Sequence, residues 1–158
     1  MHDAIPEDEL RKLHKYFAIE CNNRAWRLSE AALRSAPEDR EMLDAAHAAA
    51  FHWSKVGTEL HAARAGMLLG HVHALLGNAD LAMRHARSSF DFLTARDDTP
   101  AWETAFAHAV LANAAAAARD RATHAEHYAR ARALGAALDD DDRPYFDATF
   151  KTIPAAVA

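Results

Sequence analysis

The chain of 158 residues has little of what sheets and disulfide-stabilised folds require. It contains one cysteine, five glycines and five prolines, and valine, isoleucine and threonine together contribute only 14 residues. Because β-strands are rich in β-branched and aromatic residues, this composition excludes a sheet-rich fold. The single Cys21 excludes an internal disulfide and favours a reducing compartment such as the cytoplasm.

Long apolar runs and an excess of basic charge are also absent. The longest stretches without a formal charge have 15 residues, residues 104–118 among them, whereas a membrane-spanning helix needs roughly 20. The first eight residues are acidic and lack the apolar segment of a signal peptide. With 18 basic against 23 acidic residues the net charge is −5, and no basic stripe is present. We therefore expect a cytoplasmic protein that binds neither nucleic acid nor membranes.

Alanine dominates what is present. There are 40 alanines, and 51% of the residues are apolar, which favours helices and excludes a disordered chain. Apolar residues recur at spacings of three and four, beginning with the stripe Leu10, Leu13, Phe17, Cys21, Ala25, Leu28 and Ala32. The sequence predicts a single all-α domain of about seven helices.

Residues typical of helix ends separate these apolar stripes. Ser35 and Glu38 have the spacing of a capping box, and Gly57 ends the helix that follows. Thr99 is expected to cap a helix whose first residue is Pro100. The boundaries divide the chain into two N-terminal helices in 1–57, a helix pair in 58–95, a second pair in 99–135 that ends at Gly135, and a capping helix in 139–153.

The two central helix pairs resemble each other. A shift of 43 residues superposes identical residues at several positions, among them Ala82 on Ala125 and Ala86 on Ala129. The first pair also resembles a tetratricopeptide unit, with small residues where its helices touch and a turn between them. The residues that carry this resemblance are Leu69-Gly70, Gly77-Asn78, Ala82, Ala86 and Phe90.

A wider resemblance covers most of the chain. The pattern is similar to that of an uncharacterised bacterial family of tetratricopeptide-like proteins, and the second helix pair is a degenerate copy of the repeat. The matching residues are Asn22-Asn23-x-x-Trp26, Ala46-His47, His52-Trp53, Gly57, Asp141-Asp142-Arg143 and Ile153-Pro154. The resemblance implies a right-handed stack of antiparallel helix hairpins and no assigned activity.

The resemblance also implies a binding groove, because the first helix of each tetratricopeptide pair lines a concave surface. Carried over by position, the groove residues are Arg64, Met67, His71, Ala74 and, in the second pair, Val110. Arg64 would hold a carboxylate of the ligand above an apolar floor. We expect a non-catalytic protein that binds a peptide segment or partner protein there, with self-association left open. The alternative is that the chain's own helices fill the groove.

A second hypothesis is a small-molecule pocket, in a binding protein or an enzyme, between the two N-terminal helices. Asparagine is a poor residue for a helix interior, so consecutive asparagines there indicate either a polar binding spot or hydrogen bonds to a neighbouring helix. A tryptophan beside a histidine can line such a pocket or simply anchor the core. The residues of this alternative pocket are Asn22, Asn23, Trp26, His47, His52 and Trp53.

Metal ligands on one helix need spacings of three or four residues to share a face. Among the 11 histidines only His124 and His127 qualify, and Asp120 extends the stripe. The alternative is that Asp120 caps the helix and both histidines are solvated. Because closed zinc sites use four ligands and this stripe offers fewer, we expect no bound metal. We also expect no other cofactor. The interior candidates His47, His52 and His71 predict lower stability near pH 5 than at pH 7.5.

Overall fold

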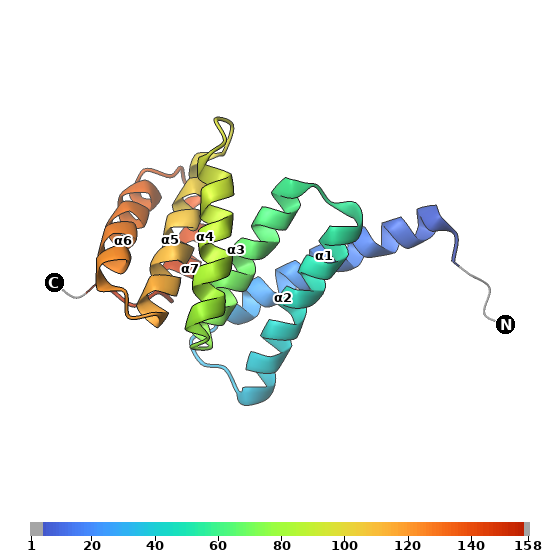
Figure 1. Cartoon of the computed structure of the whole chain (residues 1–158), viewed down its shortest axis with the longest axis horizontal. Coiled ribbons are helices and arrows are strands. Elements are labelled where there is room, and N and C mark those ends of the chain that lie inside the picture. The colour runs from blue at the N-terminus through green and yellow to red at the C-terminus, as the bar shows by residue number, and fades with distance from the viewer. Residues whose placement is uncertain (1–4, 157–158) are drawn as a thin grey trace.

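The structure, a computed structural model that describes residues 5–156, is helical with short connections over that range (Figure 1). The helices are α1 (Glu7–Ser29), α2 (Ala36–Val56), α3 (Glu59–Leu75), α4 (Ala79–Thr94), α5 (Ala101–Ala117), α6 (Arg121–Ala136) and α7 (Arg143–Phe150). None of these described helices has both the length and the apolar character needed to cross a bilayer. Over the described residues, the prediction of an all-α fold with about seven helices is confirmed.

The helices pack as three successive hairpins followed by α7. Helix α1 lies along α2, α3 along α4 and α5 along α6, and α2 and α4 each also pack against the first helix of the next hairpin. The first helices contact one another directly, because α3 touches both α1 and α5 while α5 touches α7. We call α1, α3, α5 and α7 the first layer. The N-terminal part of α1 extends beyond the other helices, on the right of Figure 1.

Small residues allow the helices of a hairpin to approach closely. A Cβ atom added to Gly70 in α3 would lie 2.9 Å from the backbone nitrogen of Ala86 in α4, so glycine is needed at this crossing. Ala82 and Ala86 are both buried in the main core, as their spacing predicts. A second core cluster joins α1, α2 and α3 around Met42 and Leu68.

Two predicted helix ends are confirmed. The Ser35 backbone N–H donates to Glu38 Oε2 at 2.7 Å, and the Glu38 N–H donates to Ser35 Oγ at 3.4 Å, which completes the capping box of α2. Gly57 is the residue that ends α2, where its N–H donates to the Trp53 carbonyl.

Two other predicted ends are wrong. Helix α5 begins at Ala101 with Pro100 as the capping position, while the Thr99 hydroxyl donates to the Leu93 carbonyl at 2.6 Å and so belongs to the end of α4. Gly135 lies inside α6 rather than after it. Its role is packing, because a Cβ at this position would overlap the ring of Phe146 in α7.

Candidate functional site

The four helices of the first layer line a pocket of about 310 Å³ that is partly open to solvent, which we call the central pocket. Its volume is at the lower end of the range for ligand sites. It combines residues from both predicted sites: Arg64 and Met67 from the groove, and three from the alternative pocket. The full lining is Asn22, Asn23, Trp26 and Glu30 from α1, Arg64 and Met67 from α3, Trp102 and Phe106 from α5, and Tyr145 and Thr149 from α7.

Aromatic side chains form the apolar part of the central pocket. The Trp26 ring stacks on His71 with 5.5 Å between ring centroids, and it meets Phe106 edge to face at 5.8 Å. Trp102 meets Phe106 at 6.1 Å in the same way. Edge-to-face and stacked contacts of this kind fix ring orientations. The apolar wall is therefore preformed.

An ion pair within the protein holds Arg64 at the edge of the pocket. Arg64 Nε donates to Glu103 Oε1 at 2.5 Å and Nη2 donates to Oε2 at 3.1 Å. The Glu103 side chain is 1% exposed, whereas the Arg64 side chain is 39% exposed. These bonds raise the pKa of Arg64, and its guanidinium also lies 5.8 Å from the Trp102 ring centroid. The group predicted to bind a ligand carboxylate thus already binds one from α5.

The remaining polar groups of the pocket come from α1 and α7. The Thr149 hydroxyl donates to Glu30 Oε1 at 3.4 Å, and burial raises the pKa of the Glu30 carboxyl. The Asn22 amide donates to Asn23 Oδ1 at 3.4 Å. Each asparagine offers both a donor and an acceptor, which is the combination that a peptide group requires.

The other predicted groove residues do not line the central pocket. His71 is fully buried beneath Trp26, with its Nδ1 atom 3.1 Å from Nδ2 of Asn113, and burial lowers the pKa of His71 to about 4. Val110 is also buried in the core, and Ala74 borders a different cavity near the end of α5. The chain's own side chains therefore fill this part of the predicted groove. Of the predicted groove residues, only the partly exposed Arg64 and the buried Met67 line the central pocket.

The alternative pocket is not one site. His47 is exposed on α2 instead of interior. The Nδ1 atoms of His52 and His14 lie 2.7 Å apart, and Trp53 stacks on His61 with 4.2 Å between ring centroids. None of these three predicted residues lines the central pocket, where Asn22, Asn23 and Trp26 lie.

The residues predicted to bind a metal also contact different partners. Asp120 caps α6 by accepting the Thr123 N–H at 3.1 Å. His124 Nε2 lies 2.8 Å from the Pro154 carbonyl, while His127 Nδ1 lies 2.9 Å from Nδ1 of His108. Both histidines of the stripe are buried, so they are not the solvated residues of the alternative prediction. Within residues 5–156, no three His, Cys, Asp or Glu side chains are arranged to hold a metal ion.

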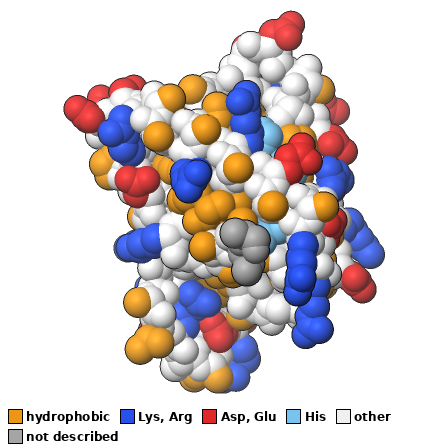
Figure 2. All heavy atoms as spheres, turned by 90° about the vertical axis from the view of Figure 1, so that its left-hand side faces the viewer, with side chains coloured by type: hydrophobic (Ala, Val, Ile, Leu, Met, Phe, Trp, Pro, Cys, Tyr) orange, Lys and Arg blue, Asp and Glu red, His pale blue; other side chains and the backbone are white. Residues whose placement is uncertain are grey.

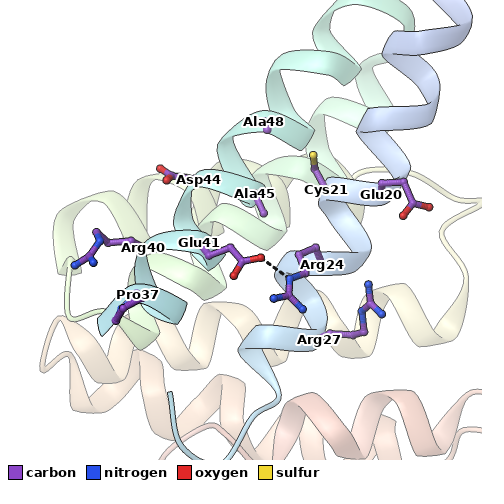
Figure 3. A pocket seen from close by; sticks show the side chains of 10 residues that line it. All are labelled: Glu20, Cys21, Arg24, Arg27, Pro37, Arg40, Glu41, Asp44, Ala45 and Ala48. Carbon is purple, nitrogen blue, oxygen red and sulfur yellow. Dashed lines mark hydrogen bonds and ion pairs between the residues drawn. The ribbon is translucent and has the colours of Figure 1, made fainter. Parts of the chain in front are cut away.

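A wider hollow of about 700 Å³ opens between α1 and α2 (Figure 3). Arg24 Nε crosses it to donate to Glu41 Oε1 at 2.6 Å, and further side chains of both charges surround this pair. Cys21 borders the hollow, but burial raises the pKa of its thiol and so disfavours the reactive thiolate. The central pocket, with its aromatic wall and fixed polar groups, is the better candidate site.

Surface charge is mixed at the end of the molecule where α6 lies. Figure 2 shows Lys and Arg side chains interspersed with Asp and Glu around an apolar area. Elsewhere, Arg34 and Arg96 each lie within 3.0 Å of an aspartate oxygen.

No family model matches the sequence, and comparisons with curated proteins and with solved structures give no match. The fold and the site define an all-α protein with a preformed, partly aromatic pocket in its first helical layer. Its function is therefore argued from the chemistry of that pocket.

Proposed function

We propose that this protein is a non-catalytic, tetratricopeptide-like module that binds a short extended segment of a partner protein in the cytoplasm. One apolar side chain of that segment would enter the central pocket. The arrangement of α1, α3 and α5 supports this proposal, because successive first helices that contact one another are the way helical repeats build a binding surface.

The shape of the pocket favours a single inserted side chain. A volume of about 310 Å³ leaves room for one large apolar side chain against Trp26, Trp102 and Phe106. Binding energy in protein interfaces is concentrated in such anchors, where an apolar group fills a pocket and water is excluded. The partly exposed rings of Trp26 and Trp102 are the surfaces that this side chain would cover.

The pair of Arg64 and Glu103 is the observation that carries the proposal. Two of the five N–H donors of Arg64 are used by Glu103, which leaves three for a ligand. Because Glu103 neutralises the guanidinium, Arg64 offers directional hydrogen bonds without a net positive charge. Carbonyl oxygens of a peptide backbone satisfy such donors, and the amides of Asn22 and Asn23 match the peptide group beside them.

The three tryptophans allow a direct test. Peptides selected from a random displayed library can be titrated into ¹⁵N-labelled protein while the indole N–H signals are followed by NMR. We expect saturable shifts at Trp26 and Trp102, which line the pocket, with dissociation constants on the order of micromolar. The signal of Trp53 should not move, because this residue lies outside the pocket.

Matched variants make the test specific. Asn23→Ala and Tyr145→Ala alter exposed residues of the pocket and should weaken peptide binding about fivefold or more, without changing stability. Tyr16→Ala, at an exposed position outside the pocket, is the control and should bind as the unmodified protein does. Selected peptides that shift Trp53 alone, or that tolerate both pocket variants, would contradict the proposal.

A further inference from the structure

The central pocket contains an acidic side chain without an ion-pair partner. Glu103 is paired with Arg64 at the edge of the pocket, whereas Glu30, which lines the pocket, takes part in none of the ion pairs among the described residues. Within residues 5–156, its one side-chain hydrogen bond is the long one from the Thr149 hydroxyl, at 3.4 Å. Glu30 is also partly buried, so water solvates its carboxylate incompletely.

The groups around Glu30 do not replace the water that its carboxylate has lost. Burial raises the pKa of the Glu30 carboxyl, because it disfavours the charged form. The hydrogen bond from Thr149 and the charge of Lys151 act in the opposite direction, but burial outweighs both. Lys151 is exposed, so water and salt screen its charge. The negative charge of Glu30 is therefore largely uncompensated in the described part of the chain.

The position of Glu30 in the fold adds to this negative charge. Glu30 is the residue that ends α1, where the helix dipole has its negative pole and an acidic side chain is unfavourable. A residue that conflicts with such a local preference, without compensation from its neighbours, is typical of a functional site. The end of α1 and the Glu30 carboxylate together make this side of the pocket attractive for a cation.

An aromatic surface lies beside the carboxylate. Trp26 precedes Glu30 by four residues, the spacing that places two side chains on the same face of a helix, and both side chains line the pocket. The Trp26 side chain is partly exposed. Indole rings attract cations, and the Arg64 guanidinium already lies 5.8 Å from the ring centroid of Trp102. A basic side chain next to Glu30 would therefore have both an anion and an aromatic ring as neighbours.

We propose that the segment bound in the central pocket carries a lysine or arginine next to its apolar anchor, and that Glu30 forms an ion pair with this basic side chain. This inference rests on the proposed function, because it specifies the segment that the pocket binds. The aliphatic stem of the basic residue would cover the Trp26 ring while its charged end reaches the carboxylate. Arg64 does not oppose this pairing, because Glu103 neutralises the guanidinium through two hydrogen bonds.

Peptide selection on matched variants tests the proposal. Random displayed peptides are selected on the unmodified protein, on Glu30→Gln and on Glu20→Gln. Glu20 is the control because it is an exposed glutamate of α1 outside the central pocket. We expect lysine or arginine to be enriched beside the apolar anchor on the unmodified protein and on Glu20→Gln, but not on Glu30→Gln. The new amide keeps an oxygen that can accept the hydrogen bond from Thr149.

A double-mutant cycle measures the ion pair itself. One selected peptide, and its analogue with norleucine in place of the basic residue, are titrated into each protein by calorimetry. Norleucine keeps an aliphatic stem but lacks the charge. The analogue should bind the unmodified protein and Glu20→Gln about fivefold more weakly than the parent peptide does. In Glu30→Gln the two peptides should bind equally well, because the partner of the charge has been removed.

Three results would overturn this inference and leave the proposed function standing. The first is selected peptides that shift the signals of Trp26 and Trp102 but show no enrichment of basic residues. The second is a norleucine analogue that binds as weakly to Glu30→Gln as to the unmodified protein, relative to the parent peptide. The third is enrichment that is lost in Glu20→Gln as well, which would indicate a general effect of the acidic surface. Peptides that bind outside the central pocket would instead contradict the proposed function, and this inference with it.

Discussion

Glu103 in α5 is almost completely buried, and its only ion-pair partner among the described residues is Arg64 of α3. The two side chains meet through two hydrogen bonds, of 2.5 and 3.1 Å. From the sequence alone, Arg64 is expected to hold a carboxylate of the ligand. The structure changes that expectation, because the arginine also compensates a buried charge.

We therefore predict that Arg64→Ala destabilises the protein. Removal of the guanidinium leaves the Glu103 carboxylate buried without a counter-charge, which should lower the free energy of unfolding by about 3 kcal/mol. Urea unfolding measures this loss. The double variant Arg64→Ala with Glu103→Gln is the control, since a neutral amide removes the buried charge and should recover part of the stability. An Arg64→Ala protein with an unchanged urea midpoint would contradict the prediction.

Two glycines of α3 give a second prediction about the hairpin contact. A Cβ at Gly70 would lie 2.9 Å from the backbone of Ala86, so Gly70→Ala should cost roughly 1–3 kcal/mol through overpacking. A Cβ at Gly66 would meet Ser89 Cβ at 3.9 Å, which is ordinary contact. Gly66→Ala should therefore stabilise the helix, by about 0.5–1 kcal/mol.

The comparison of these two glycine variants separates packing from helix propensity, because both place the same methyl group in one helix. Thermal unfolding of each variant is the measurement. Equal shifts of the midpoint in both would show that α3 and α4 do not approach each other at Gly70.

The helices could be predicted because their signals are local. The spacing of Ala82 and Ala86 indicates a buried helical face, and the capping box at Ser35 indicates the start of a helix. Both signals depend only on residues that are close in the sequence. Gly135 shows the limit of this reasoning. A glycine after an apolar stripe usually ends a helix, but here it is inside α6 because Phe146 packs on it from α7.

The site could be predicted only in part, since its groups come from distant positions. Arg64 and Met67 followed from their place in the predicted repeat, and Asn22 from its unusual position within a helix. Glu103 carried no signal, because an acidic residue in the first turn of a helix is usually a solvated one. Its contact with a residue 39 positions away depends on how α3 and α5 pack.

Several histidines are buried by this packing, and their lowered pKa values make the stability of the fold depend on pH. Burial lowers the pKa of His71 to about 4, and burial together with the neighbouring His127 and Arg130 lowers the pKa of His108 to about 4. Burial also lowers the pKa of His52. Of the three histidines expected to be interior, His47 is the exception, because it is exposed. The charged form of each buried imidazole is disfavoured in the folded protein.

We predict that stability falls as the pH is lowered from 7.5 to 5. Between the unfolded pKa near 6.5 and the folded pKa of about 4, His71 binds more protons in the unfolded state, so the free energy of unfolding rises with pH across this window. The contribution of His71 is complete above about pH 7, and about 2 kcal/mol of it is lost at pH 5. Urea unfolding at both pH values measures the difference.

His71→Gln removes this titrating group and should reduce the difference, while His47→Gln, at an exposed position, should leave it unchanged. Equal unfolding free energies at pH 5 and 7.5 in the unmodified protein would mean that these imidazoles change neither their solvation nor their protonation on folding.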